Sequence, residues 1–222
     1  MYDIVFPDNN EKEFIKIAEK INYKGLFFIY PFNTFQEYKH KSPIKIYSGV
    51  LCTKEEEIRK ARKISNLIVW KQTQSNRESS MQHILEKFPP DILFELEKHT
   101  QKDFMHHKNS ALNHVLVKLM AKNDVGYAIS WSMLLHNLSD TLGRVEQNIL
   151  LYKKARAKLV IASFTSNPYE LRSSNDLSAF FEQLELHPSV IKQAFNEFLN
   201  VYNKNLNKKS KNYIREGVEI VE

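Results

Sequence analysis

The chain has 222 residues, of which 42% are hydrophobic and 26% are charged, as in an ordinary globular protein. Its formal net charge of +6 favours a polyanionic partner over an acidic one. Its single cysteine, Cys52, excludes an internal disulfide framework and fits a reducing, cytoplasmic location. No run approaches the roughly 18 apolar residues of a membrane span, and the N-terminus lacks the pattern of a signal peptide. We therefore expect a protein without a membrane anchor.

Short apolar runs alternate with segments of helical periodicity along the chain. In chain order we expect a strand at 2–6, a helix at 10–21, a strand at 26–30, a short helix at 34–40, a strand at 44–52, a charged helix after 53, a strand at 67–70, a helix at 75–87, a strand at 91–95, a helix at 110–122, a strand at 125–129, helices at 131–136 and 140–156, a strand at 159–163, and helices at 168–184 and 188–203. Asp8 and Ser110 are predicted N-caps, and Thr53 with Glu56 has the spacing of a capping box.

Seven strands separated by helices predict parallel pairing, because a parallel connection needs a crossover of helical length. The strands are nearly continuous apolar runs, which is typical of sheets covered on both faces. Neither a Gly-x-Gly-x-x-Gly turn nor a Walker A sequence is present, so nucleotide-binding α/β folds lose support. We predict one domain over 1–203, a TIM-like, distorted parallel barrel of about seven or more strands. Residues 204–222 are expected to form a solvated, irregular basic tail with a short final strand at 218–221.

In such barrels the functional residues gather where the strands end, at the C-terminal face. The predicted strand ends are Phe6–Asp8, Tyr30–Phe32, Trp70–Gln72, Glu95–Glu97, Ser130–Ser132 and Ser163–Thr165. Metal-dependent phosphoesterase barrels of the polymerase-and-histidinol-phosphatase type carry His-x-His at the first of these ends, because two imidazoles bind a metal ion that activates water. This chain has Phe6-Pro7-Asp8 there, and the adjacent His106 and His107 diverge too much to be good ligands. The sequence therefore predicts no metal site, with a rearranged site as the alternative.

Other catalytic chemistry has little support in the sequence. Cys52 lies in an apolar strand and is expected to be a core residue, and no Gly-x-Ser-x-Gly elbow is present. Glu95 and Glu97 share one face of a strand end and could form an acid/base pair, although a solvated rim is the favoured interpretation. His114 could donate a proton, but a packed histidine bonded to a backbone carbonyl is favoured.

Three blocks of the sequence resemble one family. Residues 110–116, Ser-Ala-Leu-Asn-His-Val-Leu, look like the Ser-Gly-Leu-Asn-His-Val-Leu block of ribonuclease P protein component 3, the TIM-barrel subunit of archaeal and eukaryotic ribonuclease P. Residues 158–163 with 168–173 resemble its late strand and its Tyr-Asp-Leu-Arg-Ser-Pro turn, and 217–221 resemble its C-terminal ending. Ala111, Ser174 and Glu216 depart from the family's Gly, Pro and Pro. Since alanine is the better helix former, Ala111 is not expected to disturb the fold.

The resemblance implies a non-catalytic subunit. The ribonuclease P RNA, with Mg²⁺, would remove the 5′ leader from precursor tRNA, while this protein binds no cofactor and pairs with protein component 2, with a heterotetramer as one arrangement. Lysine and arginine would neutralise phosphates of an RNA read mainly by shape. The candidate contact or rim residues are Lys71, Arg77, Lys108, Asn113, His114, Lys122, Arg144, Arg172 and Ser173. The guanidinium of Arg172 suits a phosphate or a structural carboxylate, and simple solvation is the other interpretation of each surface lysine. A metal-dependent phosphoesterase and an interaction barrel without RNA are the alternatives.

Overall fold

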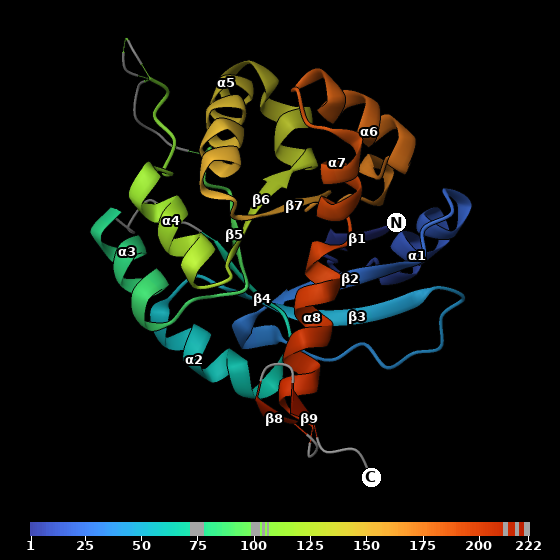
Figure 1. The fold of residues 1–222 in the computed structure, drawn as a ribbon. Helices are drawn as coiled ribbons and strands as arrows, with labels where there is room; N and C mark the ends of the chain where they lie inside the picture. Colours follow the sequence, from blue (N-terminus) through green and yellow to red (C-terminus); the bar gives the residue numbers. More distant parts are fainter. Residues whose placement is uncertain are drawn as a thin grey trace.

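The computed structural model describes residues 1–71, 78–98, 103, 105, 107–210, 213–215 and 218–219. Seven parallel strands form one sheet in sequential order. They are β1 (Tyr2–Val5), β2 (Gly25–Pro31), β3 (Lys45–Cys52), β4 (Ile68–Lys71), β5 (Ile92–Phe94), β6 (Gly126–Ser130) and β7 (Lys158–Ala162). The sheet curls into a nearly closed barrel with helices outside it (Figure 1). The predicted barrel and its parallel strands are confirmed.

The seam between β1 and β7 is closed by a few main-chain bonds and one buried carboxylate. The amide of Phe164 donates to the Ile4 carbonyl at 2.8 Å, and the amide of Phe6 donates to the Thr165 carbonyl at 2.9 Å. The Asp3 carboxylate accepts the amide of Ser163 at 2.7 Å and its hydroxyl at 2.5 Å. Because Asp3 is fully buried, these bonds replace the water that the carboxylate loses on folding.

Helices cover the outer face of the sheet. They are α1 (Glu11–Lys20), α2 (Glu55–Ile64), α3 (Glu78–Lys87), α4 (His114–Lys122), α5 (Trp131–Ala155), α6 (Ser174–Gln183), α7 (Pro188–Ala194) and α8 (Glu197–Lys208), with two short 3-10 turns, η1 (Phe32–Thr34) and η2 (Pro168–Glu170). Cys52 is buried and burial raises the pKa of its thiol to about 12. Its predicted role as a core residue is confirmed.

The last helix, α8, closes the N-terminal end of the barrel. Its Phe198 and Tyr202 pack edge-on against Phe27 of β2, with ring centroids 5.2 Å and 5.5 Å apart. Tyr47 of β3 stacks on the same ring at 4.6 Å. Figure 1 shows α8 lying across the strands. The aromatic layer anchors the first half of α8, and the helix continues to Lys208, so residues 204–208 are helical and not part of an irregular tail.

Several predicted helices differ from the structure. Residues 34–40 form no helix beyond η1, because Tyr38 packs edge-on against Phe28 at 5.2 Å and donates its amide to Ser48. The two helices predicted over 131–156 are confirmed in outline, because α5 is interrupted at Asn137, whose backbone is not helical (φ −137°, ψ 40°). The helix predicted at 168–184 begins only at Ser174, and that predicted at 188–203 divides into α7 and α8. The short final strand is β9 (Val218–Glu219), paired antiparallel with β8 (Tyr213–Arg215).

The predicted helix caps are also shifted along the chain. Asp8 does not cap α1, whose N-cap position is Asn10. The capping carboxylate of α2 is Glu57, which accepts the amides of Thr53 and Lys54 at 2.8 Å and 3.2 Å, so the predicted Thr53–Glu56 pair is one residue out of place. The start predicted for α3 at residue 75 lies outside the described residues.

Candidate functional site

Three phenylalanine rings fill the C-terminal mouth of the barrel, where barrel enzymes place their chemistry. Phe94 and Phe164 stack with centroids 4.5 Å apart, and Phe6 packs against both rings at 5.4 Å and 5.8 Å. These side chains come from the ends of β5, β7 and β1. Phe6 begins the strand end Phe6-Pro7-Asp8, where a His-x-His pair would have indicated a metal site. The mouth is therefore an aromatic plug, defined here as Phe6, Phe94 and Phe164.

An ion pair lies beside the plug. Lys71 at the end of β4 pairs with Glu95 at 2.9 Å and lies 5.9 Å from the Phe94 ring centroid. In the part of the chain that the structure describes, no group of three or more His, Cys, Asp or Glu side chains is arranged to hold a metal ion. His106 and Gln72 lie outside that part.

Glu97 corrects the expectation of a solvated rim, because it is fully buried. Its carboxylate accepts hydrogen bonds from the Tyr127 hydroxyl and from Asn148 Nδ2 at 2.8 Å, while its second oxygen lacks a partner among the described residues. Burial raises the pKa of Glu97, although these hydrogen bonds oppose the shift. Glu95 contacts Lys71 instead, so the two glutamates do not form an acid/base pair.

Arg144 lies in the same buried region and not on a surface. Its Nη1 donates to the Glu97 carbonyl at 2.9 Å and its Nε to Asp103 at 3.1 Å. Only 8% of Arg144 is exposed. The interpretation of Arg144 as an RNA contact is therefore corrected: its guanidinium binds the structural acceptors that connect α5 to the segment after β5.

The Ser110–Leu116 block also has a structural explanation. The cap of α4 is Asn113, whose Oδ1 accepts the amides of Val115 and Leu116, both at 2.9 Å. Ser110 is not the N-cap; it donates to Asn148 Oδ1 at 2.7 Å. Ala111 precedes the helix and is buried, with its amide bonded to the Leu96 carbonyl. His114 is exposed at the first helical position, so the packed histidine favoured by the sequence is wrong.

The Pro168–Ser173 turn is held by an acidic residue that the sequence analysis did not single out. Glu170 accepts hydrogen bonds from Thr165 at 2.5 Å, Ser132 at 2.9 Å and His136 Nε2 at 2.7 Å. Burial opposes ionisation, but these three bonds lower the pKa of the Glu170 carboxyl below its ordinary value. The signal was available, since Glu170 occupies the acidic position of the family's Tyr-Asp-Leu-Arg turn. Glu170 therefore joins the turn to β7 and to the start of α5.

The neighbouring Arg172 and Ser173 have local partners. Arg172 Nη1 donates to the carbonyls of Tyr169 and Leu171, both at 3.0 Å, and no carboxylate of the described residues pairs with it. The Ser173 hydroxyl caps α6 by accepting the amide of Asp176 at 3.2 Å. Lys108 pairs with Asp103 at 3.5 Å, and Lys122 is exposed at the end of α4. Arg77 lies outside the described residues. Lys71, Asn113 and Ser173 lie at strand ends or helix starts, whereas Lys122 lies at the end of α4.

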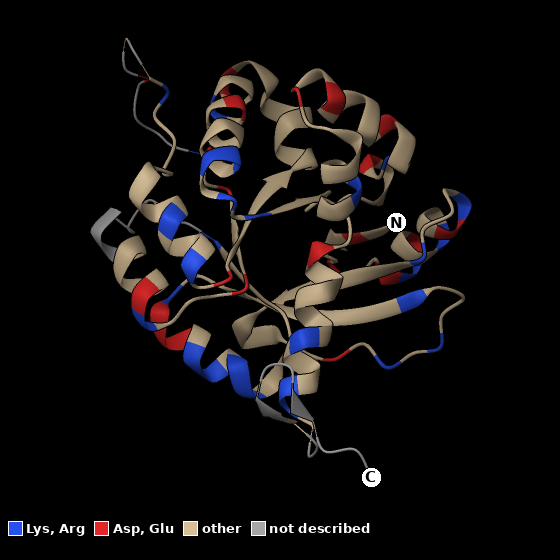
Figure 2. Cartoon of the chain, in the orientation of Figure 1, with Lys and Arg blue, Asp and Glu red and all other residues tan. Residues whose placement is uncertain are grey.

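A hollow that no sequence pattern indicated opens at the N-terminal end of the barrel. It has a volume of about 520 Å³ and is walled by α2, by α8 and by the turns that precede β5 and β6. Six basic side chains line it: Arg59, Arg62, Lys87, Lys204, Lys208 and Lys209. Figure 2 shows lysine and arginine gathered along α2 and at the end of α8 beside it. We call this hollow the basic groove.

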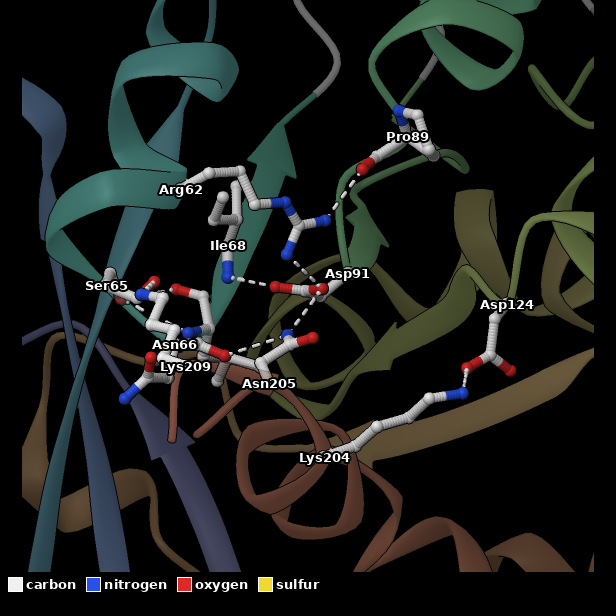
Figure 3. A network of polar contacts seen from close by, with 11 residues as sticks. Arg62, Ser65, Asn66, Ile68, Pro89, Asp91, Asp124, Lys204, Asn205 and Lys209 are labelled. Carbon is white, nitrogen blue, oxygen red and sulfur yellow. Dashed lines mark hydrogen bonds and ion pairs between the residues drawn. The ribbon is translucent and has the colours of Figure 1, made fainter. Parts of the chain in front are cut away.

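Asp91, at the start of β5, organises the wall of the basic groove (Figure 3). Its Oδ1 accepts hydrogen bonds from Arg62 Nη1 at 2.6 Å and Asn205 Nδ2 at 2.9 Å, and its Oδ2 accepts the amide of Ile68 at 2.7 Å. Arg62 also donates to the Pro89 carbonyl at 2.8 Å. One buried carboxylate thus holds α2, β4 and α8 in a single arrangement.

The fold and its two ends define a class: a parallel α/β barrel with three packed phenylalanine rings at its C-terminal mouth and a basic groove at the opposite end. The chain belongs to the RNase P subunit p30 family, whose model matches residues 2–210. The family resemblance expected from the sequence is thereby confirmed, and with it the general assignment as a protein subunit of ribonuclease P.

Relatives and solved structures agree with this assignment. Ribonuclease P protein component 3 of Methanococcus vannielii is 25% identical over 84% of this chain and 80% of its own length. That of Methanosarcina mazei is 33% identical over about half of each chain, 52% and 49%. A chain in the cryo-EM structure of archaeal ribonuclease P with mature tRNA matches with a TM-score of 0.74 and 22% identity. The match covers 100% of this chain and 98% of that chain. Zinc-bound histidinol phosphate phosphatase from Lactococcus lactis shares the fold alone, with a TM-score of 0.57 and 11% identity. That match covers 87% of this chain and 93% of the phosphatase chain.

No helix in the described ranges has the length and apolar character needed to cross a membrane.

Proposed function

We propose that this chain acts in ribonuclease P as a non-catalytic subunit that supports an RNA catalyst in removing the 5′ leader from precursor tRNA. The observation that carries the proposal is the family match over 2–210 on a barrel whose mouth is filled by Phe6, Phe94 and Phe164. A catalytic zinc site uses three protein ligands and an open position for water. The described residues provide no such set, which disfavours a metal-dependent phosphoesterase.

The remaining features of the proposal follow the family. The partners are the ribonuclease P RNA, the precursor tRNA in the assembled enzyme and protein component 2, with two copies of each protein as one arrangement. Mg²⁺ would serve the RNA, and the protein would bind no cofactor of its own. The proposed setting is the cytoplasm. The net charge of +6 supports RNA as a partner, because each phosphate neutralised by a basic side chain releases a counterion.

Reconstitution tests the proposal. The purified protein is incubated with 5′-labelled precursor tRNA, alone and together with the ribonuclease P RNA and component 2 of the same organism. We expect no cleavage by the protein alone and faster cleavage by the RNA when both proteins are present. Cleavage of a phosphoester by the protein alone, abolished by a chelator, would identify a phosphoesterase. An unchanged rate in the complete mixture would favour an interaction barrel without a role at the RNA.

Arg172 gives a residue-level test of the same proposal. Its acceptors within the described ranges are backbone carbonyls, so no carboxylate there neutralises its positive charge, which remains available to a phosphate. We propose that Arg172→Ala lowers reconstituted cleavage more than it lowers the melting temperature. Equal losses in both measurements would assign Arg172 to the stability of the turn instead.

A further inference from the structure

The basic groove has more positive charge than its own carboxylates neutralise. Asp91 and Asp124 are the two acidic side chains in its lining. Asp91 pairs with Arg62 at 2.6 Å. Asp124 pairs with Lys158 at 2.8 Å and with Lys204 at 3.0 Å. Both carboxylates therefore have ion-pair partners already, and within the described ranges no ion pair joins them to Arg59, Lys87 or Lys208.

The excess charge belongs to Arg59, Lys87 and Lys208. All three are exposed, and within the described ranges none has an ion-pair or hydrogen-bonding partner for its side chain. They come from α2, α3 and α8, yet they surround one hollow. Lys209 adds a fourth cation whose acceptor is the neutral Ser65 carbonyl at 2.8 Å. Like charges that are held near one another repel, so an anion in the groove would relieve this repulsion.

The groove is also rigid enough to present these charges. Asp91 fixes Arg62, Asn205 and the amide of Ile68, and Asn205 donates a further bond to the Asn66 carbonyl at 3.0 Å. Figure 3 shows these contacts joining α2, α8 and the strand starts. Because α2 and α8 are held by buried bonds, Arg59 and Lys208 would bind an anion without ordering the backbone first, which limits the entropic cost of binding.

We propose that the basic groove binds the phosphate backbone of the RNA, and this inference rests on the proposed function. An acidic protein is the less suitable occupant, because protein interfaces are anchored by buried aromatic side chains in the centre of the patch. Phe88, the aromatic side chain in this lining, is already half-buried against His83. Flexible lysine and arginine side chains around a hollow instead suit phosphates, which fix position without reading bases. The groove therefore supplies affinity and not sequence recognition.

The proposal assigns the N-terminal end of the barrel as an RNA contact. The candidates suggested by the sequence lie elsewhere. Lys71 is at the C-terminal end of β4, and Asn113 is at the N-terminal end of α4. The continuation of α8 beyond residue 203 places Lys204 and Lys208 in the lining of the groove. Lys209, at the end of the helix, reaches the Ser65 carbonyl that follows α2.

The test compares two variants that lose the same charge. The groove variant carries Arg59→Ala, Lys87→Ala and Lys208→Ala. The matched control carries Lys16→Ala, Lys20→Ala and Lys192→Ala, three exposed lysines of α1 and α7. Binding to labelled ribonuclease P RNA of the same organism is measured between 50 and 300 mM salt (on the order of the range over which counterion release is resolved), and melting temperatures are recorded for both.

We expect the groove variant to bind the RNA roughly 10-fold or more weakly at ~0.1 M salt, with a salt dependence reduced by about one phosphate contact per lost side chain. The RNA affinity of the control should change by less than about 3-fold, and neither variant should melt earlier, since the replaced side chains have no ion-pair or hydrogen-bonding partners among the described residues. Equal binding by groove variant and control would overturn the assignment of the groove while leaving the subunit role intact. Failure of the unaltered protein to bind RNA, or to raise cleavage with component 2, would overturn the proposed function itself. Loss of component 2 binding with RNA affinity retained would show a protein-binding surface and overturn the proposal.

Discussion

The two ends of the barrel are built from opposite chemistry. At the C-terminal mouth, Phe94 and Phe164 are nearly fully buried and Phe6 packs on both. At the N-terminal end, six basic side chains line an open groove of about 520 Å³. Barrels that act as enzymes keep the polar, open site at the C-terminal end and use the other end for stability. Here the ends of β5 and β7 are covered by aromatic rings, a hollow remains over the ends of β1, β2 and β3, and the basic side chains gather at the opposite end.

Strained backbone at the mouth sharpens this comparison. Glu95 and Phe164 follow β5 and β7 and have φ values of +59° and +48°, a conformation that side chains with a Cβ rarely adopt. Such residues persist where the surrounding structure holds them, and they cluster at functional sites. In this chain Phe164 holds a stacked ring over the barrel core instead of a ligand. The strain at the mouth is thus used for packing.

The largest effect is expected from emptying the aromatic plug. Phe94→Ala removes a ring that stacks on Phe164 and contacts Phe6, so it should lower the free energy of unfolding by about 3–5 kcal/mol. RNA affinity, measured at a temperature where the variant is folded, should stay unchanged because the basic groove lies at the other end. Phe94→Leu keeps most of the volume and should lose only about 1 kcal/mol. Weakened RNA binding by folded Phe94→Ala would remove the separation between the two ends.

The seam below the plug gives a pH-dependent prediction. Burial raises the pKa of the Asp3 carboxyl from 3.8 to about 6, although hydrogen bonds from Ser163 and Ile4 oppose the shift. A carboxyl with a higher pKa in the folded than in the unfolded state binds its proton more tightly when folded. Its contribution to stability is therefore greatest below about pH 4 and decreases as the pH rises through 6. The shift corresponds to roughly 3 kcal/mol at most.

Asp3→Asn should remove this dependence, since an amide does not ionise and can still accept the amides of Ile4 and Ser163. In urea unfolding between pH 4 and 7.5, the free energy of unfolding of the variant should rise relative to that of the natural protein by up to about 3 kcal/mol as the pH rises. Parallel stability curves for the two proteins would contradict a raised pKa at Asp3. RNA affinity should be unaffected, because the seam does not reach the groove.

The strands and the parallel barrel could be predicted from the sequence, since each strand is a continuous apolar run and each crossover has helical length. The absence of His-x-His could also be predicted, because the first strand run ends in Phe6-Pro7-Asp8. The plug could not, because Phe94 and Phe164 look like ordinary core residues until the strand ends meet. Glu97 was predicted to lie on a rim because glutamate is seldom fully buried, and only its partners Tyr127 and Asn148, far along the chain, explain its burial.

The basic groove was out of reach of sequence patterns for a geometric reason. Arg59 and Lys208 are separated by most of the chain, and only the packing of α8 across the barrel brings them to one hollow. The prediction of an irregular tail from residue 204 placed Lys204, Lys208 and Lys209, three of the six basic side chains of the groove, outside the predicted barrel. Lysines among asparagines resemble a solvated segment, whereas the aromatic contacts that hold this helix, from Phe198 and Tyr202, precede them.

The smallest effect concerns Asn113, which the family resemblance suggested as an RNA or rim contact. Its Oδ1 is used by the amides of Val115 and Leu116, so Asn113→Ala should lower stability by about 1 kcal/mol through loss of the helix cap. Asn113→Asp and Asn113→Ser keep an acceptor and should restore most of the loss. Cleavage by the reconstituted enzyme should follow stability across the three variants. If Asn113→Ser folds like the natural protein but supports slower cleavage, then the amide nitrogen contacts the RNA machinery, and the C-terminal rim shares in binding with the basic groove.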